Sequence, residues 1–298
     1  MRREVGQDVG VSDTEPTPAN DRHQPSTTPD LGALRDLAER AARAAGTLVR
    51  EGRPTRVDVS GTKSSHIDIV TEMDLASETL LRTVIAAERP NDGVLGEEEG
   101  LIPGTSGLTW VIDPIDGTVN YLYGIPAYAV SVAVVSGPPD PSHWTVLAAC
   151  VHAVADGRTW TASVGGGTHQ DGRPVRVNPA KQLAGSLLGT GFGYTVERRR
   201  TQARVVAELL PDVRDIRRIG SAALDLCAVA SGSLDAYYER GLQPWDAAAG
   251  SLIAQEAGAT VVGLRGRPAD EQMTVVGPGP TVAELVRRLE LLGADQDG

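Results

Sequence analysis

The 298-residue sequence is poor in cysteine, histidine and aromatic residues. Its two cysteines, Cys150 and Cys227, lie among apolar residues, and neither belongs to a CxxC motif or to a Cys/His pattern with zinc-ligand spacing. We interpret both as small buried hydrophobic side chains. The five histidines are scattered and form no HExxH motif, which argues against histidine-based metal binding or acid–base chemistry.

Acidic residues outnumber basic ones, and the formal net charge is −11. This balance argues against direct binding to nucleic acid or to a membrane surface, because either would need a basic patch. The longest apolar runs, such as residues 128–135, are too short to span a bilayer, and the polar N-terminus lacks the apolar core of a signal peptide. We therefore expect a cytoplasmic protein.

Hydrophobic residues make up 41% of the chain, enough for one large domain or two fused smaller ones. Residues 1–29 are rich in Asp, Pro, Thr and Gln and are expected to form a disordered tail. Strand-like runs with short polar links predict an antiparallel meander up to about residue 182, and strands then alternate with helices. The expected division is an N-terminal α+β domain over 30–182 and a C-terminal α/β domain over 183–298.

Helices are predicted where apolar residues recur at helical spacing behind a capping residue. The first covers about 31–51 with Asp30 as its N-cap. The second covers about 72–88, where Thr71 and Asp74 resemble a capping box.

The stretch WVIDPIDGT, which begins at Trp110, places two carboxylates three residues apart around a proline. Asp113 ends an apolar strand, where an unpaired carboxylate would be costly to bury and a cation would relieve that cost. Pro114 stiffens the backbone, and Ile115 offers its carbonyl between the two carboxylates. Asp116 alone also suits a turn or cap. Oxygen ligands of this kind suit Mg²⁺ rather than zinc or copper.

Three further acidic sites each have a simple explanation when taken singly. GEEEG at 96–100 is typical of a solvated loop, Asp246 in PWDAAAG suits a helix N-cap, and Asp74 suits the capping box. All lie near predicted strand ends or helix starts, and such ends can converge on one cleft. Gly117 and Thr118 would add an anion-binding helix start. Carboxylates for cations beside amides for an anion are what a metal-dependent phosphatase needs.

Five motifs in this order resemble the inositol monophosphatase family over about residues 31–292. They are DIVTEMD at 68–74, GEE at 96–98, WVIDPIDGTVNY at 110–121, GSAALDLCAVASGSLDAYYE at 220–239 and PWDAAAGSLIAQEAG at 244–258. The resemblance implies an α/β fold, an αβαβα sandwich of the sugar-phosphatase type. It also implies Mg²⁺ dependence, lithium sensitivity and a homodimer.

The resemblance assigns metal ligands by position. Glu97, Asp113 and the Ile115 carbonyl would hold a first Mg²⁺, and Asp113, Asp116 and Asp246 a second, in a site with two to three ions. The N-terminal domain would carry most of this metal site, and the C-terminal domain would complete the active site.

Catalytic roles follow in the same way. Glu97 and Thr118 would orient the attacking water, and Asp74 would hydrogen-bond Thr118. Glu98 is a further candidate. Lys63 matches a basic position near the phosphate or a third metal, with a solvated loop lysine as the alternative. The residues implied on the substrate side are Asp116, Gly117, Thr118, Gly220, Ser221, Ala222, Glu239 and Asp246.

The implied reaction is in-line attack of metal-activated water on a phosphomonoester, which turns inositol 1-phosphate into myo-inositol and phosphate. Val119 follows DGT where relatives that act on histidinol phosphate often carry Lys, and Glu239 matches the position that contacts inositol hydroxyls. A histidinol-phosphate phosphatase, or another small sugar or nucleotide phosphatase of the superfamily, remains the alternative within the class. The rival from a different class is a regulatory protein that binds other proteins.

Overall fold

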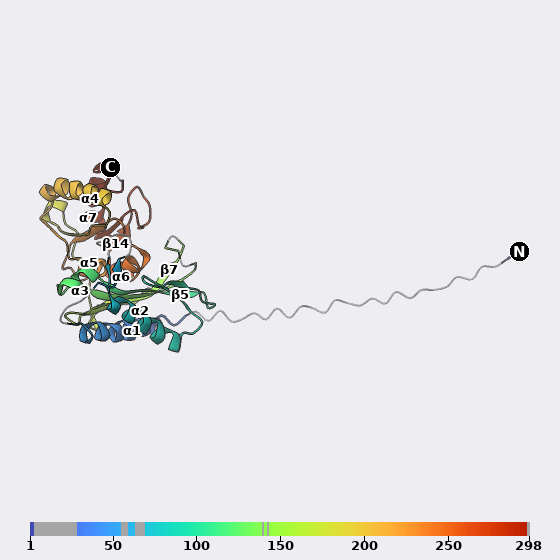
Figure 1. Cartoon of the computed structure of the whole chain (residues 1–298). Coiled ribbons are helices and arrows are strands. Elements are labelled where there is room, and N and C mark those ends of the chain that lie inside the picture. Colours follow the sequence, from blue (N-terminus) through green and yellow to red (C-terminus); the bar gives the residue numbers. More distant parts are fainter. Residues whose placement is uncertain (3–28, 55–58, 63–68, 139, 142, 297–298) are drawn as a thin grey trace.

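The computed structural model describes residues 1–2, 29–54, 59–62, 69–138, 140–141 and 143–296. The expected tail at 1–29 falls almost entirely outside these residues, as does Lys63. Within the described part, helices and sheets alternate in five layers, which confirms the αβαβα architecture (Figure 1). The helices are α1 (Leu31–Glu51), α2 (Glu72–Glu88), α3 (Thr118–Tyr123), α4 (Val196–Leu209), α5 (Ala222–Ala230), α6 (Pro244–Glu256) and α7 (Gly279–Leu291).

The first sheet has eight strands in the order β10-β9-β8-β7-β6-β5-β3-β4. From β5 to β10 each strand runs antiparallel to the next, as the meander predicts, whereas β3 lies parallel to β5. The strands are β3 (Gly93–Gly96), β4 (Gly100–Ile102), β5 (Leu108–Asp116), β6 (Ala129–Ser136), β7 (Thr145–Ala153), β8 (Thr159–Ser163), β9 (Gly167–Gln170) and β10 (Arg173–Pro174). A separate pair joins β1 (Gly61–Thr62) to β2 (Ile69–Val70).

The second sheet has five strands in the order β12-β11-β13-β15-β14. Strand β11 is parallel to both of its neighbours, and β15 is antiparallel to both of its own. The strands are β11 (Leu187–Thr190), β12 (Asp215–Arg217), β13 (Ala236–Glu239), β14 (Thr260–Val262) and β15 (Thr274–Gly277), and two short 3₁₀ turns cover Leu183–Gly185 and Leu210–Asp212.

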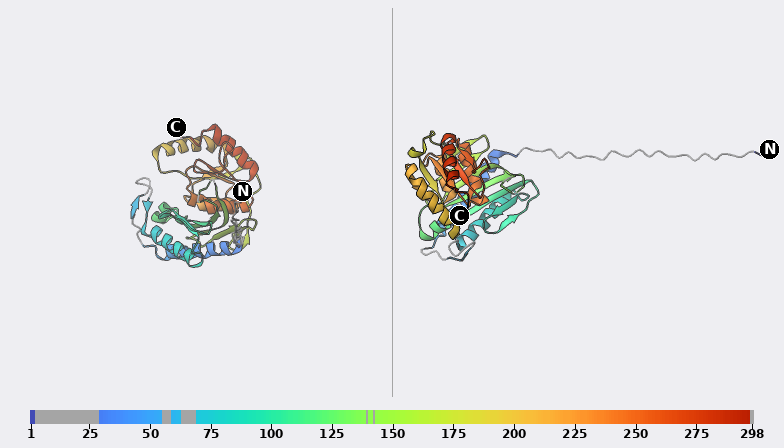
Figure 2. Two further views of the ribbon diagram at one scale, coloured as in Figure 1. Left: turned by 90° about the vertical axis from the view of Figure 1, so that its right-hand side faces the viewer. Right: turned by 90° about the horizontal axis from the view of Figure 1, so that it is seen from above.

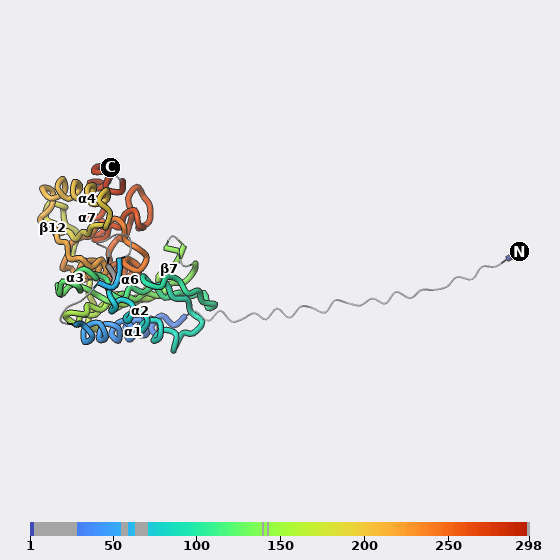
Figure 3. Tube along the Cα trace, viewed as in Figure 1, coloured from blue at the N-terminus to red at the C-terminus, as the bar shows by residue number. Residues whose placement is uncertain are grey.

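The hydrophobic core follows these layers. One cluster joins α1 and α2 to one face of the first sheet, and a second joins the other face to α5 and α6. Helices α4 and α7 cover the far side of the second sheet, opposite α1 and α2 (Figure 2). The C-terminal half, yellow to red in Figure 3, therefore supplies helices that pack on the sheet of the N-terminal half. The division near residue 182 stays a prediction.

Capping residues in the sequence correctly predicted where α1 and α2 begin, whereas β5 and α6 have other boundaries than predicted. Asp30 Oδ1 accepts the Ala33 N–H at 3.1 Å and caps α1, and Thr71 and Asp74 form the expected capping box of α2. Strand β5 continues to Asp116, with an irregular register after Asp113, so the strand does not end at Asp113. Helix α6 begins at Pro244 rather than at Asp246.

Asp246 consequently has a different helical position from the one expected. It is the third residue of α6, and its Oδ2 accepts the N–H of the N-cap residue Gln243 at 2.7 Å. A proline is well suited to the first helical position, because it needs no N–H partner there. The N-cap interpretation of Asp246 was therefore wrong, although the side chain does take part in the cap.

Candidate active site

Three aspartates from distant parts of the chain meet at one point. Carboxylate oxygens of Asp113, Asp116 and Asp246 all lie within 4.8 Å of one another. The first two come from the end of β5, and the third comes from the first turn of α6. Asp113 and Asp116 are buried and Asp246 is half-buried. The structure thus brings together three of the predicted metal ligands.

The backbone around Pro114 fixes the first two carboxylates. The Ile115 N–H donates to Asp113 Oδ1 at 3.0 Å, and the Pro114 carbonyl accepts the Ser77 hydroxyl of α2 at 3.0 Å. Asp116 Oδ2 accepts the Ser221 hydroxyl at 2.6 Å, at the start of α5. These bonds tie the Pro114 backbone to α2 on one face of the sheet and the Asp116 carboxylate to the start of α5 on the other.

Helix α5 supports Asp116 with its first turn. The Ala223 N–H donates to Asp116 Oδ2 at 2.7 Å, and the Ser221 hydroxyl also accepts the Leu224 N–H as the N-cap. Ser221 is buried and contacts the metal-ligand candidate directly. Its predicted role toward the substrate, with that of Ala222, stays a prediction.

Thr118 lies in a chain of hydrogen bonds that begins at α2. Its hydroxyl lies 3.1 Å from Asp74 Oδ1 and 3.0 Å from the Ile115 carbonyl, either of which can accept its proton. The other Asp74 oxygen accepts the Thr71 N–H at 2.8 Å and the Thr71 hydroxyl. Asp74 and Thr118 therefore make the predicted contact.

Gly117 takes a backbone conformation that other residues rarely adopt. Its φ is 98°, and a Cβ there would lie 3.0 Å from the Ala127 carbonyl and 3.1 Å from the Gly220 carbonyl. Glycine is required by both the torsion and the space. Helix α3 begins at the next residue, as the anion-site interpretation of DGT expects.

A cavity of about 1230 Å³ connects these groups to the remaining candidates. Glu97 and Glu98, in the turn between β3 and β4, line it together with the three aspartates. Glu97 lies outside the tight aspartate group but close enough to raise the pKa of Asp246. All the predicted ligand positions therefore border one space.

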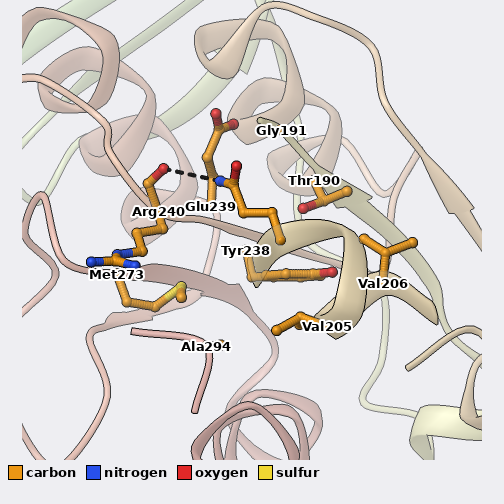
Figure 4. Close-up of a pocket in the computed structure, with 10 residues that line it drawn as sticks. Thr190, Gly191, Val205, Val206, Tyr238, Glu239, Arg240, Met273 and Ala294 are labelled. Atoms are coloured by element: carbon orange, nitrogen blue, oxygen red, sulfur yellow. Dashed lines mark hydrogen bonds between the residues drawn. The ribbon is translucent and has the colours of Figure 1, made fainter. Parts of the chain in front are cut away.

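The end of β13 also borders the cavity, through Glu239. Figure 4 shows the Glu239 carboxylate pointing away from the Tyr238 ring, which packs in a small pocket against α4. Glu239 accepts the Tyr237 hydroxyl, and burial raises its pKa to about 7. Glu239 borders the main cavity as predicted, as do Gly220, Ser221 and Ala222.

Asp225 is a buried acid that the sequence reasoning missed. It lies on α5, borders the cavity and has a carboxyl oxygen without a hydrogen-bond partner within the described residues. Burial, and then the negative charges of Glu239 and Asp116, raise its pKa to about 9. An acid among the apolar residues of GSAALDL was the available signal.

Arginines were missed as well. Arg198, Arg199, Arg218 and Arg240 line the cavity, and the Arg218 guanidinium lies 6.0 Å from the centre of the Phe192 ring. The run of arginines at the start of α4 was a visible signal, yet only folding brings these side chains to the lining of one cavity. An acidic protein thus presents positive charge beside its carboxylate cluster.

The electrostatics of the aspartate group fit a bound divalent cation. Burial raises the pKa of Asp116, and burial together with Asp116 and Glu97 raises that of Asp246 well above its ordinary value. A cation would offset the cost of burying these charges and the repulsion that Asp246 meets from Asp116 and Glu97. The donors are all oxygen atoms, including the carbonyl of Ile115, which is the ligand type that Mg²⁺ takes. The residues present therefore fit Mg²⁺.

The αβαβα fold and the carboxylate site are those of a phosphoric monoester hydrolase, the class of the matching family and of its named relatives. The chain belongs to the inositol monophosphatase family, whose model matches residues 30–290.

Known proteins resemble the chain over most of its length. The Mycobacterium tuberculosis inositol-1-monophosphatase SuhB is 45% identical over 281 residues, which cover 88% of this chain and 93% of that protein. Its solved structure superposes with a TM-score of 0.74 at 43% identity, covering 90% of this chain and 99% of that one. The Escherichia coli Nus factor SuhB is 37% identical over 234 residues, covering 78% and 85%.

A solved structure with bound inositol monophosphate also matches. The inositol monophosphate-bound SaIMPase-II has a TM-score of 0.72 at 28% identity, covering 88% of this chain and 97% of that chain.

None of the described helices is both long and apolar enough to cross a bilayer.

Proposed function

We propose that this protein is a Mg²⁺-dependent phosphomonoesterase that hydrolyses inositol 1-phosphate to myo-inositol and phosphate. The observation that carries the proposal is the convergence of Asp113, Asp116 and Asp246 in a cavity that also holds Glu97 and Glu239. Family membership supports the reaction class, and the relative bound to inositol monophosphate supports the substrate.

The proposed ligand sets follow the carboxylates. Glu97, Asp113 and the Ile115 carbonyl would hold one Mg²⁺, and Asp113, Asp116 and Asp246 would hold another. When bound, Mg²⁺ supplies charge neutralisation for the phosphate and lowers the pKa of water. A count of two to three ions is part of the proposal.

The chain's own groups would position the nucleophile. Because the Thr118 hydroxyl can donate to Asp74 or to the Ile115 carbonyl, its lone pairs are left to accept a hydrogen bond from water. The Glu97 carboxylate would accept the other proton of that water. The backbone N–H groups of Gly117 and Thr118 would orient the phosphate at the start of α3.

The alcohol part of the substrate would face β13 and α5. The Glu239 carboxylate accepts the Tyr237 hydroxyl and keeps further lone pairs that can accept hydrogen bonds from a polyol. Gly220, Ser221 and Ala222 shape the same wall of the cavity.

A phosphate-release panel tests the proposal. Inositol 1-phosphate, histidinol phosphate, fructose 1,6-bisphosphate and adenosine 3′,5′-bisphosphate are compared with Mg²⁺ and with added Li⁺. We expect Mg²⁺-dependent release that Li⁺ inhibits, with the highest kcat/KM on inositol 1-phosphate. A higher value on histidinol phosphate or on a bisphosphate would select the alternative phosphatase instead, and the arginines beside the cavity make the bisphosphate arms informative.

The name of the Escherichia coli relative, Nus factor SuhB, keeps the protein-binding role as the second candidate. Normal Mg²⁺ binding without phosphate release from any panel member would favour that role. The homodimer, the cytoplasmic location and the absence of direct nucleic-acid binding stay predictions of the sequence.

A further inference from the structure

One face of α2 points three buried polar side chains at the site. Asp74, Ser77 and Glu78 are all fully buried, and each contacts a different segment. Asp74 contacts Thr118, and Ser77 donates to the carbonyl of Pro114. The positions i, i+3 and i+4 share one helix face, so a single turn of α2 touches all of these segments.

Glu78 contacts the acidic turn between β3 and β4. Its Oε2 accepts the Glu98 N–H at 2.8 Å, and its Oε1 accepts the Glu99 N–H at 3.0 Å. The turn residues lie between the paired ends of β3 and β4, so the strand ladder does not satisfy these N–H groups. Glu78 thus supplies the hydrogen bonds that the hairpin lacks.

Arg82 completes the contact from the next turn of α2. Its guanidinium donates to Glu78 Oε1 at 2.7 and 3.0 Å and to the Gly100 carbonyl at 2.7 Å, and it lies 3.3 Å from Glu99 Oε2. A methyl group on Gly96 would overlap the Glu78 carboxylate, so this glycine admits the contact. Both ends of the turn are therefore tied to one helix.

We propose that Glu78 is a positioning residue that holds the 97–99 turn so that Glu97 faces the aspartates of β5 and α6. Ser77 ties the Pro114 backbone to the same helical turn, so α2 sets the distance between the two ligand segments. Glu78 is already bonded to Arg82 and to two N–H groups, and it contacts neither substrate nor metal in this role. The inference rests on the proposed function only for the identity of the metal.

The test is Mg²⁺ binding by calorimetry to the full chain carrying Glu78→Gln. The two turn N–H groups meet different oxygens of Glu78, so a glutamine in the same place would face one of them with its NH₂, which cannot accept. We expect Mg²⁺ affinity to fall by about tenfold or more, the usual effect of removing a group that orients a metal ligand. KM at saturating Mg²⁺ should change little, and added Mg²⁺ should restore much of kcat.

Glu88→Gln is the matched control, because Glu88 lies on the same helix and pairs with Arg40 at an exposed position. It should leave Mg²⁺ affinity unchanged. Gly96→Ala is a second test variant, because its methyl group would push the Glu78 carboxylate away from the turn without removing that carboxylate. This variant should also weaken Mg²⁺ binding, which keeps the inference testable if Glu78→Gln fails to fold.

Wild-type Mg²⁺ affinity in both Glu78→Gln and Gly96→Ala would overturn the inference, even if thermal stability fell. A wild-type protein that binds no Mg²⁺ would also overturn it. Normal binding by the wild type without phosphate release would instead remove the proposed function and leave the role of Glu78 intact.

Discussion

At the residue scale, the site depends on acids placed where water is scarce. Asp113, Asp116 and Asp225 are buried, and Glu239 lines the same cavity. Each is held by a different set of donors, so similar carboxyl groups acquire different properties. Three substitutions separate their roles.

Asp113→Asn keeps the shape of the side chain and an oxygen that can accept the Ile115 N–H, but it removes the charge. We expect the fold to persist and Mg²⁺-dependent phosphate release to fall on the order of a thousandfold, because several kcal/mol of charge stabilisation are lost. Phosphate release and thermal melting measure the two effects. Near-wild-type turnover would contradict the shared-ligand role.

Glu239→Gln should change substrate preference more than catalysis. A hydrogen bond to a charged group contributes about 1.5–3 kcal/mol, so KM for inositol 1-phosphate should rise roughly tenfold or more. A generic aryl phosphate, which lacks the polyol, serves as the control and should be hydrolysed as before. An equal loss on both substrates would argue against an alcohol-binding role.

Asp225→Asn should stabilise the metal-free protein at neutral pH. Since the folded pKa of Asp225 is raised to about 9, this acid favours folding most at low pH, and that stability is lost as pH rises from about 4 to 9. Asparagine does not titrate, so the stability difference should grow by up to about 1.4 kcal/mol per pH unit in that window. Urea unfolding of both proteins at pH 4.5, 6 and 7.5 measures the difference in their unfolding free energies. A difference that does not change with pH would contradict the raised pKa of Asp225.

At the element scale, local signals set the helices, while contacts between elements aim the side chains. The caps of α1 and α2 formed where the sequence predicts them. By contrast, α6 starts earlier and β5 runs further than predicted, since Pro244 can open a helix and β6 continues to pair with Asp116. Such shifts of a few residues decide where Asp113 and Asp246 point.

The contact between β7 and α1 carries a pH dependence of its own. His152 is buried against Gly46 and hydrogen-bonds Thr159, and burial lowers its pKa below 6.5. Above pH 6.5 His152 is neutral in both the folded and the unfolded chain and adds no pH dependence to the free energy of unfolding. Below pH 6.5 the imidazole of the unfolded chain takes up a proton more readily than that of the folded chain. Stability should therefore fall by up to about 1.4 kcal/mol per pH unit as pH drops.

His152→Gln tests this contribution, because glutamine can bond Thr159 without titrating. Thermal melts of both proteins between pH 5 and 7.5 give the two slopes. The variant should show a shallower loss below pH 6.5, and parallel slopes would contradict the assignment to His152.

At the scale of the whole molecule, the site joins two halves of the chain. Asp116 belongs to the first sheet, and its partner Ser221 lies 105 residues later. Helices α5 and α6 come from the C-terminal half yet share a core with the first sheet. Ligand binding should consequently stabilise the entire fold rather than one half.

Mg²⁺ should raise the unfolding free energy by about 2.7 kcal/mol at a concentration one hundred times its Kd. For a chain of this size that is a rise in Tm of several degrees, which EDTA should reverse. A fluorescence melt with and without Mg²⁺ measures it. Asp113→Asn is the control and should show little rise, and an equal rise in both proteins would place the Mg²⁺ elsewhere.

The sequence by itself determined the reaction class, the family and the positions of the ligand candidates. Those signals are local: DPIDGT, GEE and PWD each place an acid beside a strand end or helix start, and caps depend on residues three apart. The comparisons with known proteins confirmed the family, the layered fold and the phosphatase class that these signals predict. The individual roles of the site residues remain predictions that the variants above address.

Only the tertiary structure decided which groups meet. Contacts between distant segments produce three features: the hydrogen bonds of Glu78 to the 97–99 turn, the burial of Asp225, and the arginines that line the cavity. No spacing in the sequence encodes such contacts, because they arise when layers pack and bury polar groups that then need partners. The chain carries the chemical groups in short motifs, and packing of the layers sets their distances and their pKa values.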